Sequence, residues 1–474
     1  GHEDHIGAVP YFAAELGVPL YATPFTAALI RGKLEEQGIA DDVELNVIPM
    51  GHAFQLGPFG IKLMPLAHSI LEMSALLIDT PYGKIFHTGD WKLDAEPVIG
   101  QPSTEEQLRA VGDEGILALV CDSTNVFNSG DSGSEGSVKA DLIKSVKAAR
   151  GRVVVTTFAS NAARLQTLGE VAREAGRKLC FAGRSLQKII QASQATGYLK
   201  DLPELVDMEA VDGLPRHEVM VVATGGQGEA RAALARIAEG NHPVKLEEGD
   251  TVIFSSKQIP GNEIAIGHVM NHLARRNILT VTEKQAHVHV SGHPGRPELA
   301  KLYEWIRPQI LVPVHGERRH MAEQARFGLQ QGIAQAIVQS NGDVVRLAPK
   351  GPEKIGEEHT GRLAVDGDTI IAANGDTINQ RRRLSWYGLV SVAIALDGDD
   401  NLLGDPVIRV HGVPIEEDLE DFLDEAGLAI EKTVKEWRGD MDSLRESVRL
   451  AVRRVATSWT GKKPIVDVLI VETA

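Results

Sequence analysis

The chain opens with Gly1-His2-Glu3-Asp4-His5, which sets three strong metal-binding side chains within four residues. A helix is expected to begin directly afterwards, at Ile6, so that a loop can aim the imidazoles and the carboxylate at one point. Imidazole and carboxylate donors together suit zinc or manganese. The alternative is a polar segment whose histidines are incidental. Residues further along the chain decide between the two.

Three more candidate ligands each follow a short apolar stretch of strand length. They are His68, Asp90 and His315. A lone histidine at the end of a strand is more often a structural residue than a ligand, but this succession of sites after the opening cluster favours a shared centre. Two divalent ions about 3.5 to 4 Å apart can hold the attacking and the leaving oxygens of a phosphodiester. The pattern therefore predicts a hydrolase with two metal ions.

Composition bounds the class of protein. The chain of 474 residues exceeds one hydrophobic core, which rarely grows beyond about 250 to 300 residues, so several domains are expected. No apolar run approaches the roughly 20 residues that cross a bilayer, no signal peptide opens the sequence, and two cysteines cannot build a disulfide framework. We therefore expect a cytoplasmic protein without a membrane partner. The net charge of −16 argues mildly against a general electrostatic grip on nucleic acid, although bound metal ions and a local basic groove can reverse the field.

The strand and helix pattern changes along the chain. Up to about residue 94, short strands with Gly and Pro turns predict a layered sheet with outer helices. Between about 137 and 280, apolar strands alternate with helices, which predicts a parallel sheet whose ligands lie at the carboxyl ends of its strands. The tail carries two long helices with apolar residues at three- and four-residue spacings, and then a last strand at 465–471.

The order of the candidate ligands resembles the metallo-β-lactamase signature: His-x-His-x-Asp-His, then a lone His, a lone Asp and a late His. Asp122 with its following Ser-Thr-Asn, the run from His289 to His293, and His315 resemble motifs of the β-CASP nucleases. With Phe158-Ala159-Ser160-Asn161, the Gly-rich loop at 224–229 and the tail, essentially the whole chain is similar to the ribonuclease J family.

The resemblance implies an α/β fold: a metallo-β-lactamase αββα sandwich with an inserted β-CASP α/β domain and a small C-terminal α/β domain. The expected parts are a first metallo-β-lactamase segment at 1–135, the β-CASP domain at 136–280, a second metallo-β-lactamase segment at 281–349, a linker at 350–361 and the C-terminal domain at 362–474.

The resemblance also implies roles for the site residues. The expected ligands of two divalent ions, zinc or else manganese, are His2 and His68 for one ion, Asp4, His5 and His315 for the other, and Asp90 between them. His293 would protonate the leaving 3′ oxygen, and Asp122 would hold its imidazole in the useful tautomer.

A second set of residues is expected to bind the substrate. Ser160 and Asn161 stand where a helix begins, a position that favours an anion, although plain helix capping explains them equally well. The resemblance favours a pocket for a 5′ phosphate, shared with His289, Val290, Ser291, Gly292 and His293. For the loop at 224–229, a tight turn is the commoner explanation and an RNA contact the alternative.

The sequence departs from the family pattern at its start. The pattern has a further His two residues before His2, so one ion lacks a ligand, and the strands that precede the motif in the family are also absent. Either the sequence is a fragment of an intact enzyme or it is a defective paralogue. We expect the fragment, because every later motif is present, and weak activity for the chain as given.

The resemblance implies a zinc-dependent ribonuclease with 5′-to-3′ exonuclease and endonuclease activity, acting in RNA maturation and decay. Its expected partners are single-stranded RNA, preferably with a 5′ monophosphate, and further copies of itself in a homodimer or larger homo-oligomer. The alternatives are an inactive RNA-binding scaffold and a β-CASP nuclease that acts on DNA. A hydrolase of a small thioester or lactam is disfavoured, because it has no need of the 137–280 insertion with Asp122 and His293.

Overall fold

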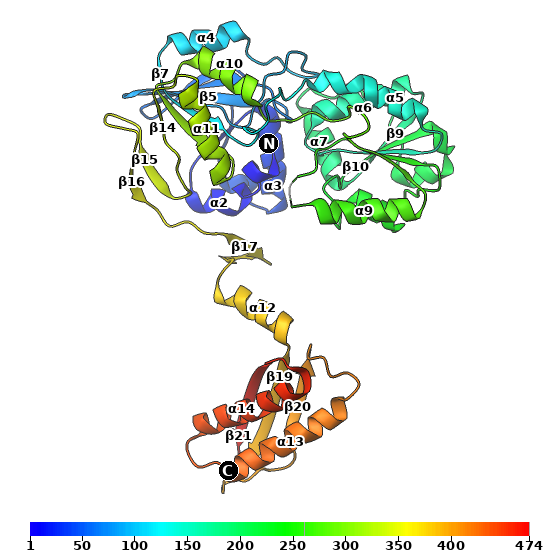
Figure 1. Ribbon diagram of the computed structural model, residues 1–474, viewed down its shortest axis with the longest axis vertical. Helices are drawn as coiled ribbons and strands as arrows, with labels where there is room; N and C mark the ends of the chain where they lie inside the picture. The colour runs from blue at the N-terminus through cyan, green and yellow to red at the C-terminus, as the bar shows by residue number, and fades with distance from the viewer. Residues whose placement is uncertain (260, 474) are drawn as a thin grey trace. The chain divides into compact units, whose positions relative to one another are not determined.

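The apolar stretches that precede the candidate ligands form strands of one sheet. The computed structural model describes residues 1–259 and 261–473 and divides into two units, Gly1–Glu358 and His359–Ala474. The first unit contains a seven-stranded sheet of order β14-β13-β7-β6-β5-β4-β3 (Figure 1). Its strands are β3 Ala53–Leu56, β4 Phe59–Pro65, β5 Ser74–Thr80, β6 Gly83–His87, β7 Ile116–Asp122, β13 Ile310–Val314 and β14 Gln335–Ala336.

Half of this sheet is parallel. β6 pairs in parallel with β7, β7 with β13, and β13 with β14, whereas β3 to β6 are antiparallel. One face is covered by three helices, α4 Glu105–Asp113, α10 Arg296–Ile306 and α11 Arg318–Gln330, through a core that includes Trp91, Leu119 and Leu302. Because β6, β7 and β13 run the same way, their carboxyl ends meet at one edge.

The N-terminal segment differs from its prediction. The expected helix from Ile6 to Leu16 is two helices, α1 Glu3–Ile6 and α2 Val9–Leu16. Pro10 accounts for the break, since a proline lacks the N–H that an internal helical position needs and suits the first turn of a new helix. The expectation of a loop at the opening cluster was therefore wrong, because Asp4 and His5 lie in a helical turn.

Next to this segment lies a small layer of secondary structure. β1 Leu20–Ala22 and β2 Leu45–Val47 pair in parallel, and α3 Pro24–Glu36 packs with them through Ile30 and Leu34. Residues 40–42 form one short 3-10 turn, η1 Ala40–Asp42.

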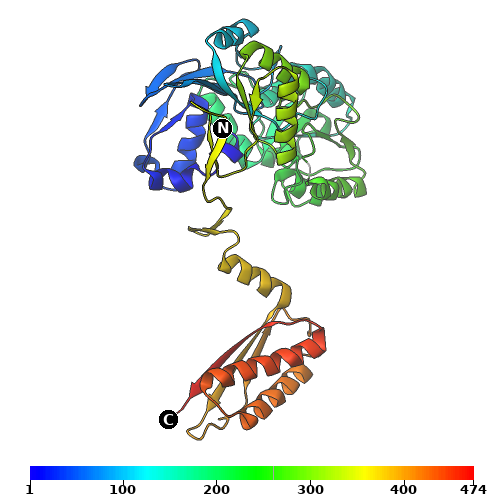
Figure 2. The same ribbon diagram turned by 60° about the vertical axis from the view of Figure 1, so that its left-hand side comes forward.

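The first unit also contains the predicted parallel sheet. Its five strands follow the order β12-β11-β8-β10-β9, and all pairs are parallel. Two apolar clusters cover its faces, one including helices α5 to α7 and the other α8 and α9 (Figure 2). The elements are η2 Glu135–Val138, α5 Lys139–Ala148, β8 Val153–Thr156, α6 Ala162–Glu174, β9 Lys178–Ala182, α7 Arg184–Ala195, η3 Met208–Gly213, η4 Arg216–Glu218, β10 Val219–Ala223, α8 Ala233–Glu239, β11 Thr251–Phe254, α9 Glu263–Arg275 and β12 Leu279–Val281.

The segment that composition marks as a linker contains a strand. β16 Glu353–Glu357 pairs antiparallel with β15 Asp343–Arg346, and Lys354 lies 2.5 Å from the Asp343 carboxylate. The division between the two units falls after this hairpin, at Glu358.

The second unit follows the pattern of its apolar residues. The hairpin of β17 Leu363–Asp366 and β18 Thr369–Ala372 is followed by α12 Asp376–Tyr387 and a three-stranded sheet of order β20-β19-β21. The two predicted helices, α13 Leu419–Glu436 and α14 Met441–Thr460, share one apolar core with this sheet. Its strands are β19 Leu389–Leu396, β20 Val407–His411 and β21 Ile465–Glu472.

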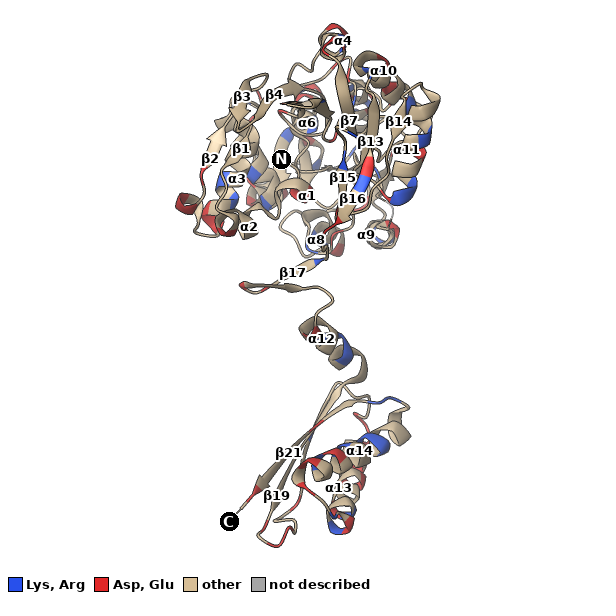
Figure 3. Ribbon diagram, turned by 90° about the vertical axis from the view of Figure 1, so that its left-hand side faces the viewer, with Lys and Arg blue, Asp and Glu red and all other residues tan. Residues whose placement is uncertain are grey.

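Charge and hydropathy complete the description. Figure 3 shows basic residues on α3, α11 and α12, although the formal net charge of the chain is −16. Throughout the part of the chain that the structure describes, every helix is too short or too polar to cross a bilayer.

Two glycines give a test of helix packing. A Cβ at Gly112 in α4 would lie 2.1 Å from the Trp305 carbonyl oxygen of α10, so Gly112→Ala forces the two helices apart. A Cβ at Gly32 in α3 meets no atom within 4 Å. We expect Gly112→Ala to destabilise the first unit by about 1 to 3 kcal/mol and Gly32→Ala to stabilise it by about 0.5 to 1 kcal/mol. Denaturant unfolding of the two variants measures both, and equal shifts in the same direction would contradict this packing.

Candidate metal centre and its neighbours

The centre forms where strand ends and the N-terminal turn meet. Asp90 follows β6, Asp122 ends β7 and His315 follows β13, so the parallel register brings all three to one edge of the sheet. His68 comes just after β4. The opening cluster supplies the remaining donors from α1.

Six of the predicted residues form two groups of possible metal donors. One group is Asp4, His5, Asp90 and His315, and the other is His2, His68 and Asp90. Within each group the donor atoms lie within 4.8 Å of one another. Asp90 belongs to both groups.

Asp90 is the common point of these contacts. Its Oδ2 atom lies 2.8 Å from His5 Nε2, 3.3 Å from His315 Nε2 and 3.9 Å from His68 Nε2. Burial opposes the charged form of this carboxyl, but the hydrogen bond from His5 and the neighbouring imidazoles hold its pKa well below the usual value. A buried, ionised carboxylate between two sets of imidazoles is suited to a shared cation.

Two of the imidazoles are held in the neutral form that binds metals. Burial lowers the pKa of His2 to about 4 and that of His68 well below its usual value. Two carbonyl groups orient the rings, because His2 Nε2 lies 3.3 Å from Ser69 O and His68 Nδ1 lies 2.7 Å from Gly292 O. The other nitrogens, His2 Nδ1 and His68 Nε2, are then free of protons and face each other at 3.2 Å. This donor set fits a divalent transition-metal ion.

His315 is placed by an unusual backbone. Its φ angle is 52°, a left-handed conformation that few residues other than glycine adopt. The next position needs glycine for space, because a Cβ at Gly316 would lie 2.4 Å from Ser123 Oγ. Thr124 Oγ1 also donates to the His315 carbonyl at 2.6 Å. The turn after β13 is thus held so that the imidazole faces Asp90.

His293 and Asp122 form a pair beside the two donor groups. His293 Nδ1 lies 2.6 Å from Asp122 Oδ2, and the ring packs against those of His68 and His315 with centroids 5.0 and 5.6 Å apart. Asp122 is 1% exposed. Burial disfavours the charged imidazole of His293, but its bond to Asp122 outweighs burial and raises its pKa. The contact orients Nε2 away from Asp122 and holds a proton on the ring.

The predicted phosphate residues divide into two segments. Asn161 caps α6, its Oδ1 accepting from Arg164 N at 3.0 Å, so its side chain already has the structural role that capping predicts. Ser160 is partly exposed just before it. Burial, with Arg164 and Lys257 nearby, lowers the pKa of His289 to about 3, and its Nδ1 has no partner among the described residues.

The 290–292 segment contributes mainly backbone. The Val290 side chain is buried in the core of the lobe that is built around the five-stranded parallel sheet (the parallel-sheet lobe). It therefore offers RNA no side-chain contact. Ser291 Oγ accepts from His293 N at 3.1 Å. The Gly-rich loop makes tight turns at Gly225 and Gly228, whose φ angles are 113° and 77°.

Some neighbours of the centre were not predicted. Gln324 of α11 is fully buried and donates to the Asp122 carbonyl at 2.7 Å. Glu298 of α10 is buried and binds segments next to Asp90 and His293. Both sit on helices, where a polar residue is usually exposed, and only their three- and four-residue spacing from apolar neighbours hinted at an inward position. His87 accepts from Gly89 N at 3.1 Å in the turn that leads to Asp90.

Known families cover most of the chain. Residues 150–273 match the family described as Ribonuclease J, beta-CASP domain, residues 280–333 match the Zn-dependent metallo-hydrolase RNA specificity domain, and residues 376–473 match the Ribonuclease J C-terminal domain. A protein named Ribonuclease J from Sinorhizobium meliloti is 42% identical over 99% of this chain and 84% of its own length. The chain belongs to the ribonuclease J family.

Other ribonuclease J proteins are similar over the same extent. Ribonuclease J 1 of Streptococcus pyogenes is 34% identical over 98% of this chain and 85% of its own length. Ribonuclease J of Thermus thermophilus is 35% identical over the full chain and 84% of its own length. Membership confirms the predicted fold class: a metallo-β-lactamase fold with a β-CASP domain and a C-terminal α/β domain.

Divalent metal binding is testable at the two donor groups. We expect His68→Ala and His315→Ala each to retain less zinc after dialysis than the unaltered chain, because each change removes one imidazole from a different group. The affinity loss should exceed the about 10- to 100-fold typical of losing an outer partner. His217→Ala is the control, since this side chain is 68% exposed and outside both groups. Metal contents equal to that of the control would refute the assignment.

Proposed function

We propose that this chain is a metal-dependent ribonuclease that degrades RNA from a 5′ monophosphate end and also cuts internally. The observation that best supports this proposal is the His293–Asp122 pair. Its Nδ1 and Oδ2 atoms lie 2.6 Å apart, beside two donor groups that share Asp90. Membership of the ribonuclease J family supports RNA as the substrate and a divalent metal as the cofactor.

The proposed ligands are the two groups around Asp90, with zinc as the expected metal and manganese as the alternative. When bound, a pair of divalent ions supplies a hydroxide near neutral pH and stabilises charge on the phosphate oxygens. The protein's part is to hold His2 and His68 neutral, which burial does, and to keep Asp90 ionised, which the hydrogen bond from His5 and the neighbouring imidazoles do in spite of its burial.

His293 is the proposed general acid. It keeps a proton because Asp122 raises its pKa, and it lies beside the donor groups, where the leaving 3′ oxygen of the nucleotide needs a proton. Asp122 does not reach the substrate in this scheme. It fixes the tautomer and direction of the imidazole and stabilises its charged form.

The 5′ phosphate is proposed to bind between the start of α6 and the 289–292 segment. Ser160 offers a hydroxyl donor there, and the dipole of α6 favours an anion at its first turn. On the other side, His289 and the backbone at Ser291 and Gly292 lie directly before His293. A phosphate held here places the first phosphodiester near the acid.

A cleavage assay tests the acid. We expect His293→Ala to lower the rate constant for cleaving 5′-monophosphorylated RNA by about 100- to 10,000-fold, the usual worth of a general acid. Asp122→Asn should have a smaller effect in the same direction, because the imidazole remains but loses its charged partner. Metal content should stay unchanged in both. If His293→Ala cleaves as fast as His217→Ala, the general-acid role is wrong; if no variant or unaltered chain cleaves, an RNA-binding scaffold is the better description.

The phosphate pocket predicts a change in substrate preference. Ser160→Ala should reduce the ratio of cleavage rates for 5′-monophosphorylated over 5′-hydroxyl RNA by about 5- to 30-fold, the worth of about 1 to 2 kcal/mol from one hydrogen bond to a charged group. Ser185→Ala, at the start of α7, is the matched control. An unchanged ratio in Ser160→Ala would remove this residue from the pocket, and a matched DNA oligonucleotide cleaved equally well would make the substrate DNA as well as RNA.

A further inference from the structure

Glu298 is a buried carboxylate that the proposed reaction does not use. It is 2% exposed and lies in the first turn of α10, shortly after His293. A carboxylate in the interior is costly unless its oxygens are hydrogen-bonded. The groups that donate hydrogen bonds to its two oxygens therefore explain how this carboxylate is stabilised in the interior.

Each oxygen of Glu298 accepts two hydrogen bonds. Oε1 accepts from Leu93 N at 3.1 Å and from Ser132 Oγ at 2.7 Å. Oε2 accepts from Ser132 N and from Gly295 N, both at 2.8 Å. An ionised carboxylate only accepts hydrogen bonds, so these four donors match it well.

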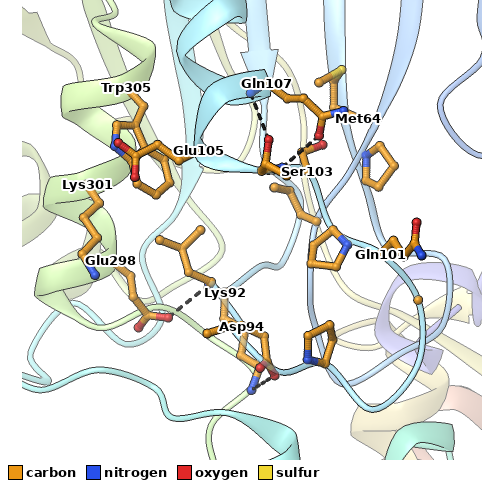
Figure 4. Close-up of a pocket in the computed structure, with 18 of the residues that line it drawn as sticks. Met64, Lys92, Asp94, Gln101, Ser103, Glu105, Gln107, Glu298, Lys301 and Trp305 are labelled. Carbon is orange, nitrogen blue, oxygen red and sulfur yellow. Dashed lines mark hydrogen bonds and ion pairs between the residues drawn. The ribbon is translucent and has the colours of Figure 1, made fainter.

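The three partner segments each adjoin a different part of the active site. Leu93 lies in the segment that follows Asp90, and Gly295 lies in the segment that follows His293. Ser132 in turn contacts the segment before His293: its carbonyl oxygen accepts a hydrogen bond from Ser291 N at 3.2 Å. Figure 4 shows Glu298 reaching from α10 toward the chain at Lys92, on the wall of a pocket of about 1220 Å³.

The segment that carries His293 is held by hydrogen bonds from several directions, including those between His293 and Asp122 and between His68 and Gly292. Residues 287–295 form neither a helix nor a strand, so individual hydrogen bonds hold them. Asn125 Nδ2 donates to the His293 carbonyl at 3.2 Å, and Glu298 binds the same segment at Gly295 and, through Ser132, at Ser291. Removing Glu298 therefore removes the direct bond to Gly295 and the two bonds that hold Ser132, whose carbonyl binds Ser291, so the segment is loosened on either side of His293.

We propose that Glu298 is a positioning residue for RNA cleavage. Its carboxylate fixes the 291–295 segment, and with it the His293 imidazole and the phosphate-facing backbone, against the strand end that carries Asp90. The kinetic part of this inference rests on the proposed function. The structural part does not.

Glu298→Gln tests the role with almost no change in shape. The new NH₂ group cannot accept, so each backbone N–H that it faces loses its hydrogen bond. We expect kcat to fall about 10- to 100-fold, as displacements of about 1 Å do elsewhere. The KM for long RNA should change far less, because its binding spreads over many phosphates. Zinc content should equal that of the unaltered chain.

Two variants on the same helix serve as controls. Glu304→Gln removes an exposed carboxylate that pairs with Arg109 at 2.6 Å, and it should keep kcat. Leu302→Ala opens the core between α10 and the sheet and lowers stability without removing a bond to the 291–295 segment. When measured below its unfolding temperature, Leu302→Ala should also have the kcat of the unaltered chain.

Hydrogen exchange of the full chain measures the segment directly and does not depend on cleavage. In Glu298→Gln, peptides covering 131–134 and 289–295 should exchange faster than in either control. Unchanged exchange, or a loss of kcat that Leu302→Ala reproduces, overturns the proposal. If the unaltered chain does not cleave RNA, the proposed function fails while exchange still decides the structural role. Should Glu298→Gln not fold, Ser132→Ala removes only the 2.7 Å bond and should shift exchange and kcat the same way by a smaller factor.

Discussion

The buried carboxylate of Asp90 is the interaction on which the site depends. Imidazoles from α1, from the segment after β4 and from the turn after β13 approach one oxygen atom, and that oxygen stays charged in spite of its burial. Without this anion, imidazoles from three separate segments would have no common partner. The position of Asp90 follows from β6, whose parallel pairing with β7 sets its end beside Asp122.

The parallel-sheet lobe interrupts the chain at a chemically important place. Asp122 ends the last strand before it, and His293 lies in the segment that returns from it, so the proposed acid and its partner stand at the two points where the chain leaves and re-enters the seven-stranded sheet. The same returning segment supplies the Gly292 carbonyl to His68. The lobe is thus joined to the metal donors by side-chain bonds as well as by the chain itself.

The sequence predicted which candidate donors come together, because each lies at the end of an apolar strand or in a dense cluster, and such ends converge in a parallel sheet. It predicted the two helices of the second unit for a similar reason, since their apolar spacing needs no distant partner. It did not predict the helical turn at Asp4, the strand at Glu353–Glu357, or the inward positions of Glu298 and Gln324. These depend on contacts with residues remote in sequence, and a glutamate in a helix looks the same whether it meets water or four buried donors. Val290 is the opposite case: its motif suggested a contact with the substrate, but its apolar side chain is buried in the core.

The hydrogen bond between His68 Nδ1 and Gly292 O has a thermodynamic consequence. It ties an imidazole of one donor group to the backbone that we propose faces the substrate, so an ion that fixed the ring would also fix that carbonyl. Coupling free energy is reciprocal: whatever factor the ion adds to the affinity for RNA, RNA must add to the affinity for the ion. A chain that holds its metal loosely is then loaded most fully when its substrate is present.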